Sequence, residues 1–248
     1  MSDKKIKGPL LQVKDLKQHF PIESGFILKK QSGAVRAVDG ITFDVKEGET
    51  LGIVGESGCG KSTTVRSIAQ LYTPTSGSVI FNGLDLIKAK GTELLDARKN
   101  IQMIFQDPYA SLDPRMTVRT IISEPLEIYK KRGLLDVDMT KGDIEDRVEE
   151  LMERVGLNRA FKNRYPHEFS GGQRQRIGIA RALALNPKII LADEPTGNLD
   201  SVMGDEVMDI LLKLNKENST TIVMVTHDKL MAEKTHKLIR LFDGSQVN

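Results

Sequence analysis

A glycine-rich segment with the pattern G-x-x-x-x-G-K-S occupies residues 55–62. It follows a short apolar run at residues 51–54 and precedes a stretch of helical character that begins at Thr63. A strand, a glycine-rich turn and a helix in this order form a phosphate-binding loop, because glycines let backbone N–H groups point at phosphate oxygens. A chance glycine turn would have no need of the Lys-Ser pair. The segment therefore predicts an α/β fold that binds nucleotide phosphates.

The residues of this loop have separable tasks. Lys61 is expected to reach the β- and γ-phosphates, and the Ser62 hydroxyl to ligate Mg²⁺. The candidate nucleotide-binding residues here are Gly55, Glu56, Ser57, Gly58, Cys59, Gly60, Lys61, Ser62 and Thr63. A redox or catalytic role for Cys59 is conceivable, but any small residue serves where the loop presents its backbone, and we favour that interpretation.

Composition restricts the class of protein. The 248 residues suffice for one α/β domain with a subdomain, and 39% of them are apolar. A formal net charge of +2 favours neither nucleic acid nor an anionic membrane as the main partner. The single cysteine rules out an internal disulfide and fits a reducing compartment. We see no signal peptide and no run of the ~20 apolar residues that a membrane helix needs, so other chains would have to span any membrane.

Apolar strand-like runs alternate with helical patterns, which is typical of a parallel sheet with crossover helices. The runs at residues 51–54, 188–192 and 221–225 each end in polar residues. Sites in open α/β sheets lie beyond the carboxyl ends of the strands, so we expect these three ends to converge on one site. Residues 79–81 and 238–241 are interpreted as further strands in a flanking antiparallel part.

The sequence between residues 107 and 187 predicts helices. Apolar residues recur there at helical spacing on one face, namely Ile144, Val148, Leu151, Met152 and Val155, and Gly156 suits a helix end. A second amphipathic helix is expected at residues 205–218, with Val207, Ile210, Leu211 and Leu214 facing inward. We therefore predict a single domain over residues 1–248, with a nucleotide-binding core at 1–106 and 188–248 and a helical subdomain at 107–187.

Two adjacent carboxylates, Asp193 and Glu194, follow the apolar run at residues 188–192. Hydrolysis needs one group to hold the metal and another to activate water. Asp193 is the candidate for Mg²⁺ and Glu194 for the attacking water. This pattern is weak alone and strong beside a phosphate-binding loop.

A second anion site is indicated where Ser170, Gly171, Gly172 and Gln173 open a helix. This site lacks the Lys-Ser pair and the carboxylates. The economical explanation is that it completes the first site of another subunit, so that head-to-tail pairing gives two complete sites.

These three motifs, in this order and spacing, resemble the ATP-binding subunits of ABC transporters, and the Ser-Gly-Gly-Gln signature is specific to ABC proteins. The resemblance covers nearly the whole chain and implies an α/β P-loop NTPase core of the ABC type, with an antiparallel β subdomain and an inserted helical subdomain. It also implies ATP and Mg²⁺ as cofactors, with four further residues at the site. Gln106 contacts Mg²⁺ and water, Asp200 acts across the dimer, His227 contacts the γ-phosphate, and Phe20 stacks on adenine. His19, His167 and His236 are interpreted as structural.

Several segments look like the oligopeptide, dipeptide and nickel import subfamily: residues 105–115, 165–170 and the stretch from Phe20 to Gly40. The resemblance implies an ATPase on the cytoplasmic face of the cell membrane that powers the import of peptides or of a related small solute. Its partners would be a second ATP-binding subunit (identical or related), transmembrane permease subunits that dock on the residues after Gln106, and an extracytoplasmic substrate-binding protein.

The second half departs from that subfamily. Residues 197–200, 226–228 and 241–244 look more like lipoprotein-release and macrolide-efflux ATPases, and the chain stops at Asn248. An export or membrane-protein release motor is therefore the alternative function. A soluble ABC protein of DNA repair or translation is a remote alternative, because neither a long coiled coil nor a second cassette is present. A non-catalytic binding partner is disfavoured because Lys61, Asp193, Glu194 and His227 are all present.

Overall fold

The computed structural model describes residues 8–24, 30–135 and 137–247. Within these ranges the chain forms two compact units. The first contains the described residues up to Ala97 and those from Thr221 onward, and the second contains those between Arg98 and Thr220. Helix α2 (Gly91–Asn100) connects the units along the chain. The predicted division into a core and a helical subdomain at residues 107 and 187 stays a prediction.

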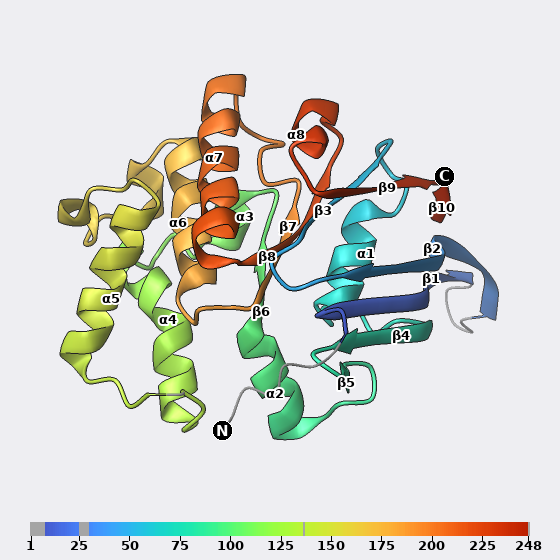
Figure 1. Ribbon diagram of the computed structural model, residues 1–248, viewed down its shortest axis with the longest axis horizontal. Coiled ribbons are helices and arrows are strands. Elements are labelled where there is room, and N and C mark those ends of the chain that lie inside the picture. Colours follow the sequence, from blue (N-terminus) through green and yellow to red (C-terminus); the bar gives the residue numbers. More distant parts are fainter. Residues whose placement is uncertain (1–7, 25–29, 136, 248) are drawn as a thin grey trace. The chain divides into compact units, whose positions relative to one another are not determined.

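An antiparallel sheet of order β2-β1-β4-β5 belongs to the first unit (Figure 1). Its strands are β1 (Leu11–Ser24), β2 (Lys30–Val45), β4 (Ser76–Phe81) and β5 (Leu84–Asp85). Leu11 at the start of β1 lies opposite Val45 on one side and Phe81 on the other, and all three side chains are buried. The antiparallel part predicted around residues 79–81 is confirmed.

The first unit also carries the strands that lead to the phosphate loop. These elements are β3 (Thr50–Gly55), α1 (Lys61–Ile68), β8 (Thr221–Thr226), α8 (Lys229–Glu233), β9 (Lys237–Phe242) and β10 (Ser245–Val247). β3 pairs in parallel with both β8 and β9, and β10 pairs antiparallel with β9. The expectation that residues 238–241 belong to the antiparallel part is wrong. α8 provides a crossover after β8, and such a connection returns the chain so that the next strand runs parallel.

The second unit contains two parallel strands and a set of helices. Its elements are β6 (Ile101–Ile104), α3 (Pro108–Ser111), α4 (Val118–Lys131), α5 (Lys141–Arg154), α6 (Gly171–Leu183), β7 (Ile189–Asp193), α7 (Ser201–Asn218) and the 3-10 turns η1 (Arg159–Phe161) and η2 (Pro166–Glu168). α5 begins at a capping box between Thr140 and Asp143, and it buries the predicted apolar stripe. α7 begins four residues before the predicted start, because Asp200 caps it. It buries Met208, whereas Ile210 is half-buried.

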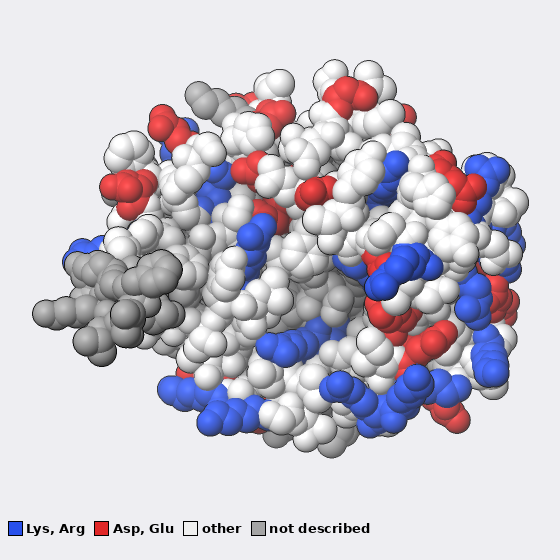
Figure 2. All heavy atoms as spheres, turned by 180° about the vertical axis from the view of Figure 1, so that it is seen from behind, with Lys and Arg blue, Asp and Glu red and all other residues white. Residues whose placement is uncertain are grey.

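No helix among the described residues is long and apolar enough to cross a bilayer. On the face drawn in Figure 2, basic and acidic side chains are both exposed and interspersed.

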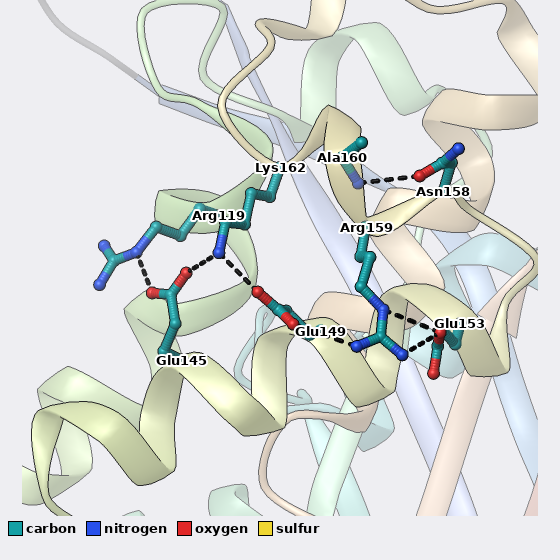
Figure 3. Close-up of polar contacts among 8 residues, drawn as sticks. All are labelled: Arg119, Glu145, Glu149, Glu153, Asn158, Arg159, Ala160 and Lys162. Atoms are coloured by element: carbon teal, nitrogen blue, oxygen red, sulfur yellow. Dashed lines mark hydrogen bonds and ion pairs between the residues drawn. The ribbon is translucent and has the colours of Figure 1, made fainter.

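A network of ion pairs fastens α5 to η1 and to the start of α4 (Figure 3). Lys162 Nζ lies 2.6 Å from Glu145 Oε1 and 2.5 Å from Glu149 Oε1. Glu145 also accepts from Arg119, and Arg159 contacts Glu149 and Glu153. Hydrogen bonds from Lys162 lower the pKa values of Glu145 and Glu149, and those two carboxylates raise the pKa of Lys162.

We expect Lys162→Ala to lower the Tm at pH 7 by up to about 3 °C, since part-exposed pairs contribute modestly. A carboxylate whose folded pKa is depressed stabilises the fold above its unfolded pKa, near 4.3, and loses that contribution as the pH falls through the folded pKa. The Tm difference between wild type and variant is therefore expected to fade below about pH 4. Melting curves from pH 7 to 3 measure it. Lys213→Ala, which removes an exposed pair with Glu217, is the matched control, and a difference that persists at pH 3 would contradict the argument.

Candidate functional site

The phosphate loop connects the buried strand β3 to α1, as the sequence predicts. Gly58 and Gly60 have φ values of 81° and 97°, a region that side chains other than glycine rarely adopt. A Cβ on Gly60 would also clash with the carbonyl oxygen of Ala37. The loop therefore needs glycine at position 60 on two independent grounds.

Lys61 extends back along the loop that precedes it. Its side chain is 4% exposed, and its Nζ donates to the carbonyl oxygens of Gly55 at 2.9 Å and Glu56 at 2.8 Å. The N-cap residue of α1 is Gly60, which offers no side-chain cap to the first helical turn. A helix start capped by no side chain, beside a buried ammonium, suits a phosphate group.

His227 follows β8 at the same sheet edge where the phosphate loop begins. Val54 and Thr226 are register partners in the parallel pair β3–β8, so the chain leaves both strands side by side. His227 is exposed, and it lines a pocket of about 430 Å³ together with Gly55 and Glu56. The structure thus brings this predicted residue to the phosphate loop.

Phe20 lies on β1 in the same unit and is half-exposed. Its ring meets the ring of Tyr72 edge-on, with centroids 5.5 Å apart. Tyr72 follows α1 in the chain, so the helix that starts at the phosphate loop leads directly to the support of Phe20. Stacking of Phe20 on adenine stays a prediction. Part of the subfamily-like stretch from Phe20 to Gly40, residues 25–29, lies outside the described residues.

The second unit holds the carboxylates. β6 and β7 are parallel, with Ile104 opposite Ala192. The chain therefore leaves both strands at one edge, where the Nε2 of Gln106 donates to Glu194 Oε2 at 3.0 Å. Asp193 is fully buried at the end of β7, and Glu194 adopts a left-handed φ of 46°. The fold thus brings two predicted site residues, Gln106 and Glu194, into direct contact.

Two side chains outside the predicted site residues hold the backbone at Phe105 and Gln106. The Nδ2 of Asn198 donates to the carbonyl oxygen of Gln106 at 3.2 Å, and the Nε2 of Gln175 donates to that of Phe105 at 3.1 Å. Gly197 packs tightly here, because a Cβ on it would lie 3.2 Å from the Gln106 amide nitrogen. Asn198 belongs to the loop at residues 197–200, in which Asp200 is the predicted site residue, and the contact of Asn198 with Gln106 has no sequence signal.

The signature segment caps α6. The Oγ of Ser170 accepts from the N–H of Gln173 at 3.3 Å, and the Gln173 side chain accepts from the N–H of Ser170 at 3.0 Å. A Cβ on Gly172 would lie 2.9 Å from the Sδ of Met203, in the first turn of α7. Asp200 caps that same helix by accepting from the N–H of Met203 at 2.9 Å. The structure thus brings the signature and the Asp200 loop together.

The segment after Gln106 exposes an aromatic ring backed by a cation. Tyr109 on α3 is 64% exposed, and the guanidinium carbon of Arg174 lies 3.6 Å from the centre of its ring. Burial lowers the pKa of Arg174. Further along, hydrogen bonds from Arg115 lower the pKa of Asp113 to about 2. The segment after Gln106 thus presents an exposed aromatic ring that contacts Arg174.

Over the described ranges, no three His, Cys, Asp or Glu side chains are grouped so that they could hold a metal ion. Mg²⁺ bound with a nucleotide usually has only one or two carboxylate ligands, because phosphates and waters supply most of the other positions. Ser62, Gln106 and Asp193 carry the oxygen donors that such an ion prefers. Their role as its ligands stays a prediction.

The comparisons with known proteins agree with the motifs. The sequence profile of the ABC transporter family matches residues 38–197. The oligopeptide transport ATP-binding protein AppF of Bacillus subtilis is 50% identical over 220 residues, which are 88% of this chain and 64% of that protein. The oligopeptide transport ATP-binding protein OppF of the same organism is 52% identical over 225 residues, 90% of this chain and 69% of OppF. The chain thus spans about two thirds of the length of these relatives.

A solved structure shares the fold. The dimeric post-hydrolysis state of the ATP-binding cassette MJ0796, bound to ADP and Pi, is 34% identical with a TM-score of 0.82. The match covers 96% of this chain and 97% of that one. The α/β fold with an antiparallel subdomain, predicted from the motifs, is confirmed. This chain belongs to the ABC transporter family.

Proposed function

We propose that this chain is the ATP-hydrolysing subunit of an ABC importer of peptides. The main observation in favour of hydrolysis is the hydrogen bond between Gln106 and Glu194. Glu194 directly follows the buried Asp193 in the chain. The relatives named for oligopeptide transport support the class of cargo.

Residues of the first unit bind the nucleotide. The backbone of residues 55–63 and the ammonium of Lys61 bind the phosphates, with the positive end of α1 behind them. Phe20 stacks on the adenine ring. His227, beside the loop, donates to the γ-phosphate.

Residues of the second unit activate the water for hydrolysis. Glu194 orients the attacking water and accepts its proton, while Gln106 fixes the carboxylate through the hydrogen bond to Oε2. Asp193, Ser62 and Gln106 would hold Mg²⁺. When bound, the ion would neutralise charge that develops on the phosphate oxygens.

A second ATP-binding subunit, identical or related, completes each site. The helix α6 starts with Ser170, Gly171 and Gly172, and its positive end suits the γ-phosphate bound by the opposite subunit. Asp200 lies at the neighbouring helix start and contacts the same opposite subunit. The dimeric state of the related cassette supports this arrangement.

The other partners are transmembrane permease subunits and an extracytoplasmic binding protein, with the chain at the cytoplasmic face of the membrane. The exposed Tyr109, backed by Arg174, supports a docking site for a permease segment in this part of the chain. Nucleic acid is not among the proposed partners. The names of the relatives favour import over the lipoprotein-release or efflux alternative that residues 197–200 suggested.

Copurification tests this function. A tagged chain, extracted from its own cells in detergent, is expected to bring down two permeases and to hydrolyse MgATP faster when a peptide-loaded binding protein is added. Tyr109→Ala is expected to lose the permeases and keep basal hydrolysis. Leu230→Ala, which removes another exposed apolar side chain, is the control. Recovery of an efflux or lipoprotein-release partner instead would overturn the import assignment.

A further inference from the structure

The phosphate loop is hydrogen-bonded to the turn between β9 and β10. This turn consists of Asp243 and Gly244, with φ values of 43° and 77°, as two-residue hairpins require. The N–H of Gly244 donates to the carbonyl oxygen of Cys59 at 3.1 Å, and the N–H of Asp39 donates to that of Gly244 at 2.8 Å. The turn therefore links the phosphate loop to β2.

A bulge in β2 lies at the same place. His19 of β1 pairs with Arg36 and Gln18 pairs with Val38, so Ala37 has no partner in β1. Bulges redirect the backbone locally, and the carbonyl oxygen of Ala37 lies where a Cβ on Gly60 would clash with it. A Cβ on Gly244 would lie 2.7 Å from the carbonyl oxygen of Arg36. The backbones of loop, turn and bulge are thus in close contact.

The chain of contacts continues to the strand that carries Phe20. Asp39 Oδ1 lies 3.1 Å from the Nε2 of His19, and the two side chains are 28% and 23% exposed. A carboxylate only accepts, so His19 is the donor. His19 immediately precedes Phe20. Asp39 therefore contacts the turn through its N–H and contacts His19, the residue before Phe20, through its carboxylate.

We propose that Asp39 and Gly244 are positioning residues that hold the base-stacking Phe20 in a set place relative to the phosphate loop. The inference rests on the proposed binding of ATP. In this proposal, the β2 bulge and the β9–β10 turn set the position of Phe20 so that it stacks on the base of the same nucleotide whose phosphates the loop binds. Neither Asp39 nor Gly244 needs to touch the nucleotide in this proposal.

The test compares two ligands by calorimetry: MgATP, which has a base, and Mg-tripolyphosphate, which has none. Phe20→Ala is expected to raise the Kd for ATP about tenfold or more, the scale of base stacking on an aromatic ring. Asp39→Ala is expected to raise it about three- to tenfold, a part of that contribution. Both variants are expected to leave the Kd for tripolyphosphate unchanged. In the Phe20→Ala background, Asp39→Ala is expected to have no further effect on ATP.

Arg36→Ala is the matched control, because it removes the exposed, 3.5 Å ion pair to Asp39 and leaves the His19 contact. Gly244→Ala is expected to weaken ATP more than tripolyphosphate, because Gly244 is bonded both to the phosphate loop and to Asp39. The Asp39 variant decides the matter if the Gly244 variant does not fold. An unchanged Kd for ATP in Asp39→Ala, with a weakened Phe20→Ala, would overturn the positioning role alone. Equal weakening of both ligands by Asp39→Ala would overturn it too. If neither Phe20→Ala nor Lys61→Ala changes ATP binding, the proposed nucleotide site itself fails, and the positioning role fails with it.

Discussion

Replacement of Glu194 by glutamine is expected to lower the steady-state rate of ATP hydrolysis by about two to four orders of magnitude, the usual contribution of a general base. The substitution preserves the size of the side chain, and its amide oxygen can still accept from Gln106. It removes the carboxylate that takes the proton of water. The measurement is phosphate release under saturating MgATP, together with the Kd for ATP, which is expected to stay within about twofold of wild type.

The matched control is Glu206→Gln. Glu206 is a glutamate of the same unit that pairs with Arg176 on the surface. It is expected to keep full turnover. Rapid hydrolysis by the Glu194 variant would remove Glu194 from the chemistry and leave the Gln106 contact as a structural one. A loss of ATP affinity as large as the loss of turnover would show that the carboxylate acts in binding rather than in the chemical step.

The fold was predictable where local patterns decide it. The stripe of α5 and the strand ends at Gly55, Asp193 and Thr226 follow from periodicity and from the polar residues that terminate buried strands. The direction of β9 was not predictable, because a short apolar run is the same in a parallel and an antiparallel pair. What determines it is α8, a five-residue helix, which is too short to carry a clear helical period.

The site was predictable as far as its motifs extend. The type and spacing of the lysine, the serine and the adjacent carboxylates indicate what chemistry they perform. The fold brings Gln106 to Glu194 and His227 to the phosphate loop. The contacts that hold these residues are made by backbone groups and by residues distant in sequence. Asn198 reaches Gln106 across 92 positions, and no local pattern encodes such a contact.

Replacement of Lys61 by alanine is expected to raise the Kd for MgATP by about two orders of magnitude or more, which abolishes hydrolysis at millimolar ATP. Lys61 is 4% exposed, and the carbonyl oxygens of Gly55 and Glu56 hold its ammonium inside the loop. At so buried a position a charge acts on phosphate through a low effective dielectric, so its loss costs more than the loss of a surface lysine.

Lys61→Arg keeps the positive charge and changes the geometry of the side chain, so it separates the effects of charge and of shape on ATP binding. The guanidinium is planar and larger than an ammonium, and it cannot place three donors around one point between two carbonyl oxygens and a phosphate. We expect it to bind MgATP almost as weakly as the alanine variant. Calorimetric titration with MgATP measures all three proteins, and circular dichroism melting establishes that each is folded. Lys88→Ala, which removes an ion pair to Asp85 in the same unit, is the control and is expected to bind ATP normally. Normal affinity in Lys61→Arg would mean that positive charge alone is sufficient, and the argument from the two carbonyl contacts would then be wrong.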